Sequence, residues 1–165
     1  MKNKLNIDNL VNEYSDTIYS IAIGYFKNKD DAEDIVQDVF TKYISCIKSG
    51  KNFKTEEYEK YWIIRVTMNL CCNKRKESNY KRNVPFIDKE TIDFEFSESE
   101  SLLLESIDKL EDKYRIVFEL FYLREFKISE ISKILKISEP NVKTRLRRAR
   151  EKLKKLLQQG GYFDG

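Results

Sequence analysis

The chain has 165 residues, of which 36% are charged and 41% hydrophobic. Its net charge of +3 is too small to indicate a nucleic-acid partner, so such a partner must be inferred from local clusters of cations. It has no histidine, which excludes Ser-His, Cys-His and His-metal chemistry, and its three cysteines are too few and too badly spaced for zinc. No apolar run approaches the roughly 20 residues of a membrane span, and the first residues lack the apolar core of a signal peptide. We therefore expect a mostly helical, cytoplasmic protein with no cofactor, no metal and no membrane insertion.

Two helices are predicted in the first 50 residues. The first has an apolar stripe at three- or four-residue spacing, formed by Leu10, Tyr14, Ile18, Ile21, Ala22 and Tyr25. The second, over residues 28–44, opens with Asp30 and Asp31, which suit the cap and the positive end of a helix. Its inner stripe is formed by Ala32, Ile35, Val36, Val39, Phe40 and Tyr43.

The opposite side of this second helix is an exposed acidic face. It is formed by Glu33, Asp34, Gln37 and Asp38. A docking site for a basic partner and plain solvation explain this face equally well. A divalent-metal site is disfavoured, because there is no histidine and no second carboxylate-bearing helix.

A third helix is predicted over residues 56–79, after a loop at 49–55. Its expected core face is formed by Tyr61, Trp62, Ile63, Val66 and Leu70. Its polar and basic groups are Arg65, Asn69, Lys74, Arg75 and Lys76. Aromatic rings beside cations suit a single-stranded nucleic acid, whose bases stack while its phosphates are neutralised. Core packing explains Trp62 as well, and both interpretations stay open.

Residues 86–100 separate two helical regions. They carry six acidic side chains and one lysine without a helical period, and Pro85 precedes them. Such a stretch is typical of a linker. We therefore predict an all-α protein with a helical domain at 1–84, an acidic linker at 85–100, a second helical domain at 101–158 and a tail at 159–165.

The second domain is predicted to contain helices at 101–110 and 113–123, followed by two helices joined by a tight turn. Ser129 can cap the first helix of this pair and Ser138 the second, which is the pattern of a helix-turn-helix. The inward residues of the first helix are Ile131, Ile134 and Leu135. Lys136 occupies the turn position where glycine is usual, and a positive φ there would cost on the order of 1 kcal/mol.

The last helix is strongly basic. Residues 141–155 contain eight lysines and arginines against one glutamate, around an apolar stripe that includes Val142, Leu146 and Ala149. Solvated faces normally mix signs, so a solvated amphipathic helix or a coiled-coil arm is the weaker interpretation. Lys143, Thr144, Arg147 and Arg148 are expected to project outward, where Lys and Arg can read guanine edges or bind phosphates.

Three stretches together resemble one family. DAEDIVQDVF at 31–40, WIIRVTMNLCCNKRK at 62–76 and the segment 110–153 are similar to bacterial RNA polymerase sigma factors of the ECF class. The resemblance covers nearly the whole chain. It implies two helical domains, similar to sigma regions 2 and 4, in a promoter-specificity subunit that is not an enzyme. The implied partners are core RNA polymerase, promoter DNA and an anti-sigma factor.

The resemblance also implies roles for individual residues. The polymerase-docking residues would be Asp31, Glu33, Asp34, Gln37 and Asp38. The surface that binds and melts the −10 element, including a loop that captures a flipped base, would use Lys51, Asn52, Phe53, Trp62, Arg65, Asn69, Lys74 and Arg75. The −35 element would be read or bound by Asn141, Lys143, Thr144, Arg145, Arg147, Arg148 and Arg150. The acidic linker would thread toward the active-site cleft and RNA exit path of the polymerase.

Two other functions compete with this interpretation. An ordinary helix-turn-helix repressor or activator would bind its operator without polymerase, but it would leave the acidic helix and the basic end of the third helix without a role. A metal-dependent nuclease would use the carboxylates of the DAED segment, and alanine at Asp34 would then abolish cleavage.

Overall fold

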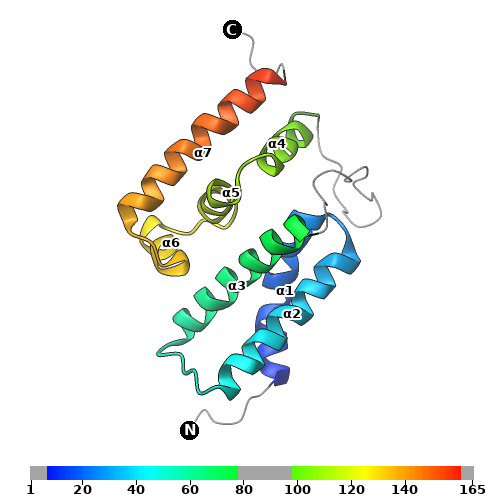
Figure 1. Ribbon diagram of the computed structural model, residues 1–165, viewed down its shortest axis with the longest axis vertical. Coiled ribbons are helices and arrows are strands. Elements are labelled where there is room, and N and C mark those ends of the chain that lie inside the picture. Colours follow the sequence, from blue (N-terminus) through cyan, green and yellow to red (C-terminus); the bar gives the residue numbers. More distant parts are fainter. Residues whose placement is uncertain (1–6, 78–97, 161–165) are drawn as a thin grey trace. The chain divides into compact units, whose positions relative to one another are not determined.

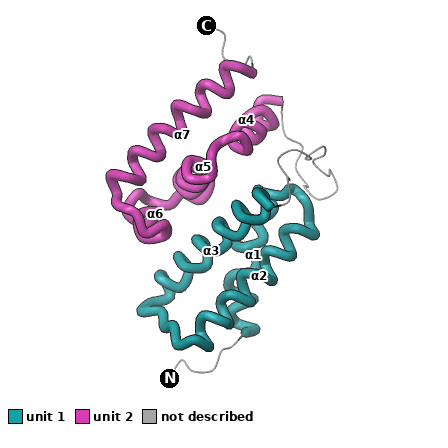
Figure 2. The backbone as a smooth tube through the Cα atoms, in the orientation of Figure 1, with its two compact units in different colours: residues 1–93 teal, residues 94–165 magenta. Residues whose placement is uncertain are grey.

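The computed structural model describes residues 7–77 and 98–160, and every regular element within these two stretches is a helix. The chain divides into two compact units, unit 1 at residues 1–93 and unit 2 at residues 94–165 (Figure 2). The all-α class and the two helical domains are confirmed. Most of the expected acidic linker, residues 85–97, lies outside the described residues. In the described stretches, no helix has the length and apolar character needed to cross a membrane.

Unit 1 is a three-helix bundle of α1 (Ile7–Phe26), α2 (Lys29–Lys48) and α3 (Glu56–Glu77), in which each helix packs against the other two (Figure 1). The whole predicted stripe of α1 is buried, from Leu10 to Tyr25. Glu59 of α3 ties the three helices together. It accepts hydrogen bonds from the hydroxyls of Tyr14 on α1, at 3.1 Å, and Tyr43 on α2, at 2.8 Å.

The start of α2 differs from the prediction. Asn28 is its N-cap, and the Asn28 side chain accepts a hydrogen bond from the backbone N–H of Asp31 at 3.0 Å. Asp30 and Asp31 lie in the first turn, where their charge still favours the positive end of the helix, but neither is the cap. The cap falls at Asn28 because Lys27, with φ 55°, ends α1 in the left-handed region just before it.

The core face of α3 is centred on different residues from those predicted. Tyr61, Trp62 and Ile63 are buried as expected, but Val66 and Leu70 are only half-buried. The further buried residues are Ile64, Thr67, Met68, Cys71, Cys72 and Arg75. Residues 61–64 are all apolar and, being consecutive, point to all sides of the helix. The periodicity alone therefore did not show which side is the centre of the buried face.

Unit 2 contains α4 (Glu98–Asp108), α5 (Asp112–Phe118), a π-helical turn η1 (Glu119–Leu123), α6 (Ile128–Leu135) and α7 (Glu139–Gln159). The long helix α7 packs against α4, α5 and α6 (Figure 1). Helix α4 begins at Glu98, inside the expected linker. One cluster of the core is formed by Ile107, Leu110 and Leu153, with Phe118 and Leu156 packed against it.

A buried arginine joins three elements of unit 2. Arg115 of α5 is 1% exposed, and its Nη1 lies 2.9 Å from Asp108 Oδ1 at the end of α4. Its Nε lies 2.7 Å from Glu119 Oε1 in η1. Buried charges are tolerated when they are paired in this way, so Arg115 acts as a structural link rather than as a surface cation.

The helix-turn-helix forms as predicted, with one correction. Ser138 caps α7 by accepting a hydrogen bond from the backbone N–H of Asn141 at 3.3 Å. Ser129 does not cap α6, because α6 begins at Ile128 and the backbone N–H of Lys127 donates to Glu130 Oε1 at 3.0 Å instead. Lys136 has φ 56°, so the predicted left-handed turn is confirmed, at a cost on the order of 1 kcal/mol.

The interface between the two helices of this motif is apolar. Ile131 and Ile134 of α6 are fully buried, as are Val142, Leu146 and Ala149 of α7. Leu135 is half-buried. The buried stripe fixes the rotation of α7 about its own axis, and this rotation turns its cationic residues outward.

Candidate nucleic-acid and partner surfaces

The outward face of α7 is a cationic surface. Its exposed members are Asn141, Lys143, Arg147, Arg148 and Arg150, while Thr144 and Arg145 are half-buried. Glu139 and Glu151 are the acidic residues of α7, so positive charge prevails over the middle of the helix. Such a face, on the second helix of a helix-turn-helix, has the shape and charge that fit the major groove of DNA.

Four of the predicted −35 residues make contacts within the protein. The Thr144 hydroxyl donates to the Pro140 carbonyl oxygen at 3.0 Å, and Arg145 Nε donates to Asn141 Oδ1 at 3.2 Å. Arg150 Nη1 donates to the Tyr122 hydroxyl at 2.9 Å. Tyr122 was not predicted, because its contact with Arg150 spans 28 residues and no short-range pattern encodes it. These contacts hold Arg145 and Arg150 in fixed directions along the helix surface.

The loop between α2 and α3 is built on an aromatic cluster. The ring of Phe53 stacks on Tyr43 with centroids 5.9 Å apart, and Trp62 meets both rings edge-on. Lys51 Nζ lies 5.5 Å from the Phe53 centroid and 5.6 Å from the Trp62 centroid. Gly50 allows the tight turn into this loop, because its φ of 97° is unfavourable for a residue with a Cβ.

Trp62 belongs to the core rather than to an open stacking surface. It is 8% exposed, which decides between the two interpretations in favour of packing. Tyr43 is anchored beneath the loop, where burial first and the hydrogen bond to Glu59 second raise the pKa of its hydroxyl above the usual range. Lys51 and Asn52 are exposed and Phe53 is half-buried, so these three residues are the accessible part of the cluster.

The polar residues of α3 divide into two groups. Asn69 is exposed and Arg65 half-buried, and burial lowers the pKa of the Arg65 guanidinium. Arg75 is 4% exposed, with its guanidinium carbon 5.9 Å from the centroid of the Tyr25 ring. The side chain of Arg75 continues the buried stripe of α3 into the bundle, so the structure does not place it on the surface where a DNA contact was predicted.

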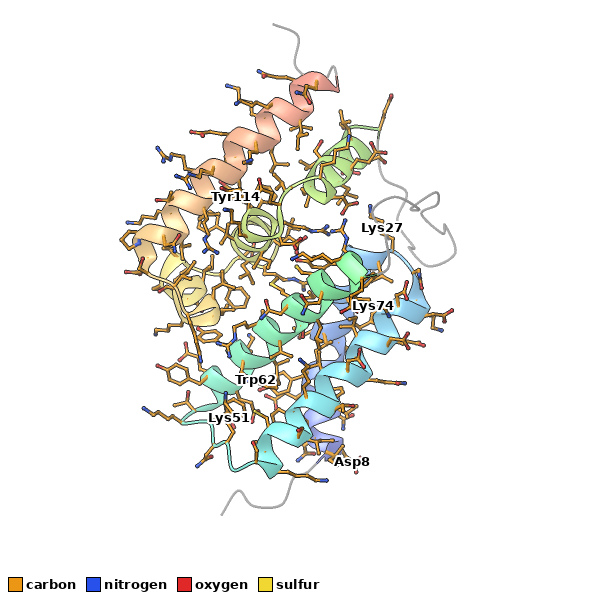
Figure 3. All side chains as sticks on the ribbon, viewed as in Figure 1. Asp8, Lys27, Lys51, Trp62, Lys74 and Tyr114 are labelled. Carbon is orange, nitrogen blue, oxygen red and sulfur yellow. The ribbon has the colours of Figure 1, made fainter. Side chains whose placement is uncertain are left out.

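Lys74 faces the acidic helix α2. Its Nζ lies 3.2 Å from Asp31 Oδ1 and 3.3 Å from Asp34 Oδ2, and 5.6 Å from the centroid of the Phe26 ring. Burial alone would lower the pKa of Lys74, but its hydrogen bonds and charge interactions with Asp31 and Asp34 raise it above the usual value. Lys74 and the pair Lys51 and Trp62 lie toward opposite ends of α3 (Figure 3).

The acidic face of α2 is exposed, as expected, at Glu33, Asp34, Gln37 and Asp38, while Asp31 is half-buried. It forms one wall of a groove of about 510 Å³, which was not predicted. The groove is lined by Asp34, Ile35, Gln37, Asp38, Lys42, Leu70, Asn73, Lys74 and Glu77. Across 7–77 and 98–160, no three acidic or cysteine side chains gather in a way that could hold a metal ion. The lining of the groove combines the carboxylates of α2 with the half-buried apolar side chain of Leu70.

Unit 2 has a groove of its own, of about 730 Å³ and mostly apolar, which was also not predicted. Its lining includes Leu103, Tyr122 and Leu123, which are exposed, together with Arg150 and Lys154 of α7. Exposed apolar patches of this kind often mark contact sites for other proteins.

The sequence matches two family models. Residues 10–79 match the model described as Sigma-70 region 2, and residues 100–153 match the model described as Sigma-70, region 4. The chain is 30% identical over 166 residues to the ECF RNA polymerase sigma factor SigM of Bacillus subtilis, with 94% of this chain and 98% of that protein covered. It is also 30% identical over 168 residues to SigW of the same organism, with 90% and 87% covered.

Two solved structures share the fold. The sigma factor RpoE of Bartonella quintana, crystallised with the anti-sigma factor NepR, gives a TM-score of 0.61 at 18% identity, with 93% of this chain and 97% of that chain covered. CnrH, solved in complex with the cytosolic domain of CnrY, gives a TM-score of 0.61 at 21% identity, with 96% and 91% covered.

Proposed function

The chain belongs to the ECF RNA polymerase sigma factors, which act in transcription initiation, and we propose that it binds core polymerase through α2, opens the −10 element with unit 1 and reads the −35 element with α7. Bond making would stay with the polymerase, so we assign the chain no catalytic residue. Its place of action would be the cytoplasm, where the polymerase works.

The observation that carries this proposal is the geometry of α7. A buried stripe holds one side of the helix against the domain, so the opposite side presents its cations to a groove of DNA. Lys143, Arg147 and Arg148 are exposed on this side, and Lys and Arg are the residues that pair with guanine O6 and N7. Arg145 and Arg150 contact Asn141 and Tyr122, and we assign them to DNA phosphates rather than to bases.

The −10 surface is proposed to lie on the loop over 49–55 and the neighbouring side of α3. Phe53 is half-buried over Tyr43 and Trp62, with Lys51 beside it. Stacking of a flipped base on such a ring can offset part of the free energy lost when the base leaves the duplex, while a lysine neutralises its phosphate. Arg65 and Asn69 extend this surface along α3. Trp62 supports it from the core.

The proposed docking surface is the acidic face of α2, formed by Asp31, Glu33, Asp34, Gln37 and Asp38. Its groove combines carboxylates with Leu70, which fits a basic segment that also carries an apolar side chain. An anti-sigma factor is a second proposed partner. The solved relatives RpoE and CnrH are bound to protein partners, and the apolar groove of unit 2 supports a protein contact in this chain as well.

Asp38→Lys tests the docking surface. We expect the affinity for core polymerase to fall roughly tenfold, mainly through slower association, because the change reverses a charge that faces the basic partner. The measurement is a titration of labelled full-length chain with core polymerase at low and moderate salt.

The matched control is Asp16→Lys, which makes the same charge change at an exposed position of α1. Circular dichroism checks that both variants keep their helical content. Equal affinities for the wild type and the Asp38 variant would remove this face of α2 from the docking site.

A further inference from the structure

Lys74 has a role that the position of its segment does not suggest. It lies in a basic run near the end of α3, yet its ammonium group faces α2. We propose that Lys74 belongs to the polymerase-docking surface rather than to the DNA surface, and that it is an internal counter-ion that limits how strongly the acidic face attracts a basic partner. This inference rests on the proposed docking role of α2.

The contacts of Lys74 hold its charge against the docking residues. Asp31 and Asp34 are three residues apart on one face of α2, and the Lys74 ammonium bridges both at 3.2 and 3.3 Å. The Phe26 ring lies 5.6 Å from the same nitrogen, within the range of a cation–π contact. The side chain of Lys74 is 29% exposed, so it is more restrained than a solvated surface lysine.

The surroundings of Lys74 are unfavourable for a DNA phosphate. The groove that it lines contains the carboxylates of Asp34, Asp38 and Glu77 as well as the cation of Lys42, and Asp31 contacts the Lys74 ammonium directly. A phosphate that approached the Lys74 ammonium would meet these carboxylates, and like charges at such a site repel. A cationic side chain would instead find the same carboxylates attractive. The groove beside Lys74 therefore favours a basic side chain over a phosphate.

Lys74 and a basic partner compete for the same oxygens. Asp34 is the carboxylate that both Lys74 and a partner can reach, because its side chain is 61% exposed while that of Asp31 is only 26% exposed. In the wild-type chain part of the charge of Asp34 is already neutralised. Removing the lysine charge makes the face more negative and leaves Asp34 to the partner, so association should become faster and more sensitive to salt.

Lys74→Met tests the inference, because methionine removes the charge and keeps an unbranched side chain that can pack on Phe26. We expect core polymerase to bind this full-length variant about two- to fivefold more tightly at low salt, which corresponds to the strength of a surface ion pair, with the gain shrinking as salt rises. The control is Lys60→Met, which removes an exposed lysine from the same helix. Lys74→Gln provides a second variant if the methionine variant has lower helical content.

A double variant locates the effect. Asp34→Asn should weaken polymerase binding more in the Lys74→Met background than in the wild type, because only there is the carboxylate released from its internal partner. Unchanged or weaker polymerase binding by the Lys74 variants overturns the counter-ion role. If the same variants, once saturated with core polymerase, also bind a forked promoter less tightly, Lys74 is a DNA ligand.

The docking surface on α2 and the counter-ion role of Lys74 are tested by different variants. If Asp38→Lys weakens polymerase binding while the Lys74 variants gain nothing, the docking surface stands and only the role of Lys74 is wrong. If Asp38→Lys also has no effect, the docking surface itself is wrong.

Discussion

Replacing Arg115 by methionine is expected to destabilise unit 2 by about 3–5 kcal/mol, because the change removes the cation in direct contact with the buried carboxylate of Glu119. Glu119 is 8% exposed and loses its 2.7 Å contact with Arg115 Nε. Asp108 loses its 2.9 Å contact as well, although water reaches it more readily. Since small domains have only about 5–15 kcal/mol of total stability, the loss would leave unit 2 close to unfolding.

The single tryptophan of the chain makes this effect measurable in the full-length protein. Trp62 lies in the core of unit 1, so its fluorescence follows the unfolding of unit 1, while circular dichroism follows both units. In urea, the Arg115 variant should lose part of its helical signal at lower concentration than the wild type, with the fluorescence midpoint unchanged. The control Lys113→Met removes an exposed cation from the same helix. Coincident curves for wild type and the Arg115 variant would show that the ion pairs contribute little.

The second large effect is expected at the promoter. Arg148→Ala should cost about 1–3 kcal/mol of binding at one position of the −35 element, because Arg148 is exposed on the outward face of α7, where an arginine can pair with a guanine. The measurement is competition among −35 variants for polymerase loaded with the full-length chain. Base reading predicts that the variant no longer distinguishes bases at that position while its preferences elsewhere persist.

Lys155→Ala is the matched control for Arg148, because it removes an exposed cation near the end of the same helix. It should weaken binding to every promoter variant by a similar factor and reduce the salt dependence. A loss of the same uniform kind for Arg148→Ala would assign Arg148 to a phosphate instead of a base.

The sequence predicted those features that depend on neighbours along one helix. The stripe of Val142, Leu146 and Ala149 is buried because spacings of four and three residues put these side chains on one side of the helix. Ser138 caps α7, and Lys136 takes the left-handed conformation, because cap and turn chemistry is local.

Apart from the caps at Asn28 and Lys127, which lie slightly before the predicted ones, the features that were missed depend on residues far apart in the chain. Lys74 lies 40 residues from Asp34, so nothing local in the basic run around it shows that its charge is directed at α2. Arg75 belongs to the same basic run as Lys74, and nothing in that run shows that it is buried. Its burial follows from the rotation of α3 within the bundle. That rotation could not be predicted, because Ile63 and Ile64 are both apolar and point to adjacent sides of the helix, so either could mark the centre of the buried face. Both are buried.

Run-off transcription measures whether this chain enables core polymerase to start RNA synthesis at defined promoters. Purified full-length chain is combined with core polymerase and fragmented source DNA, and the starts of the transcripts are sequenced. We expect transcripts that begin at discrete sites, each preceded by shared −10 and −35 elements, and only when both components are present. If the chain binds a DNA operator tightly on its own and yields no defined starts with polymerase, it does not act as a sigma factor.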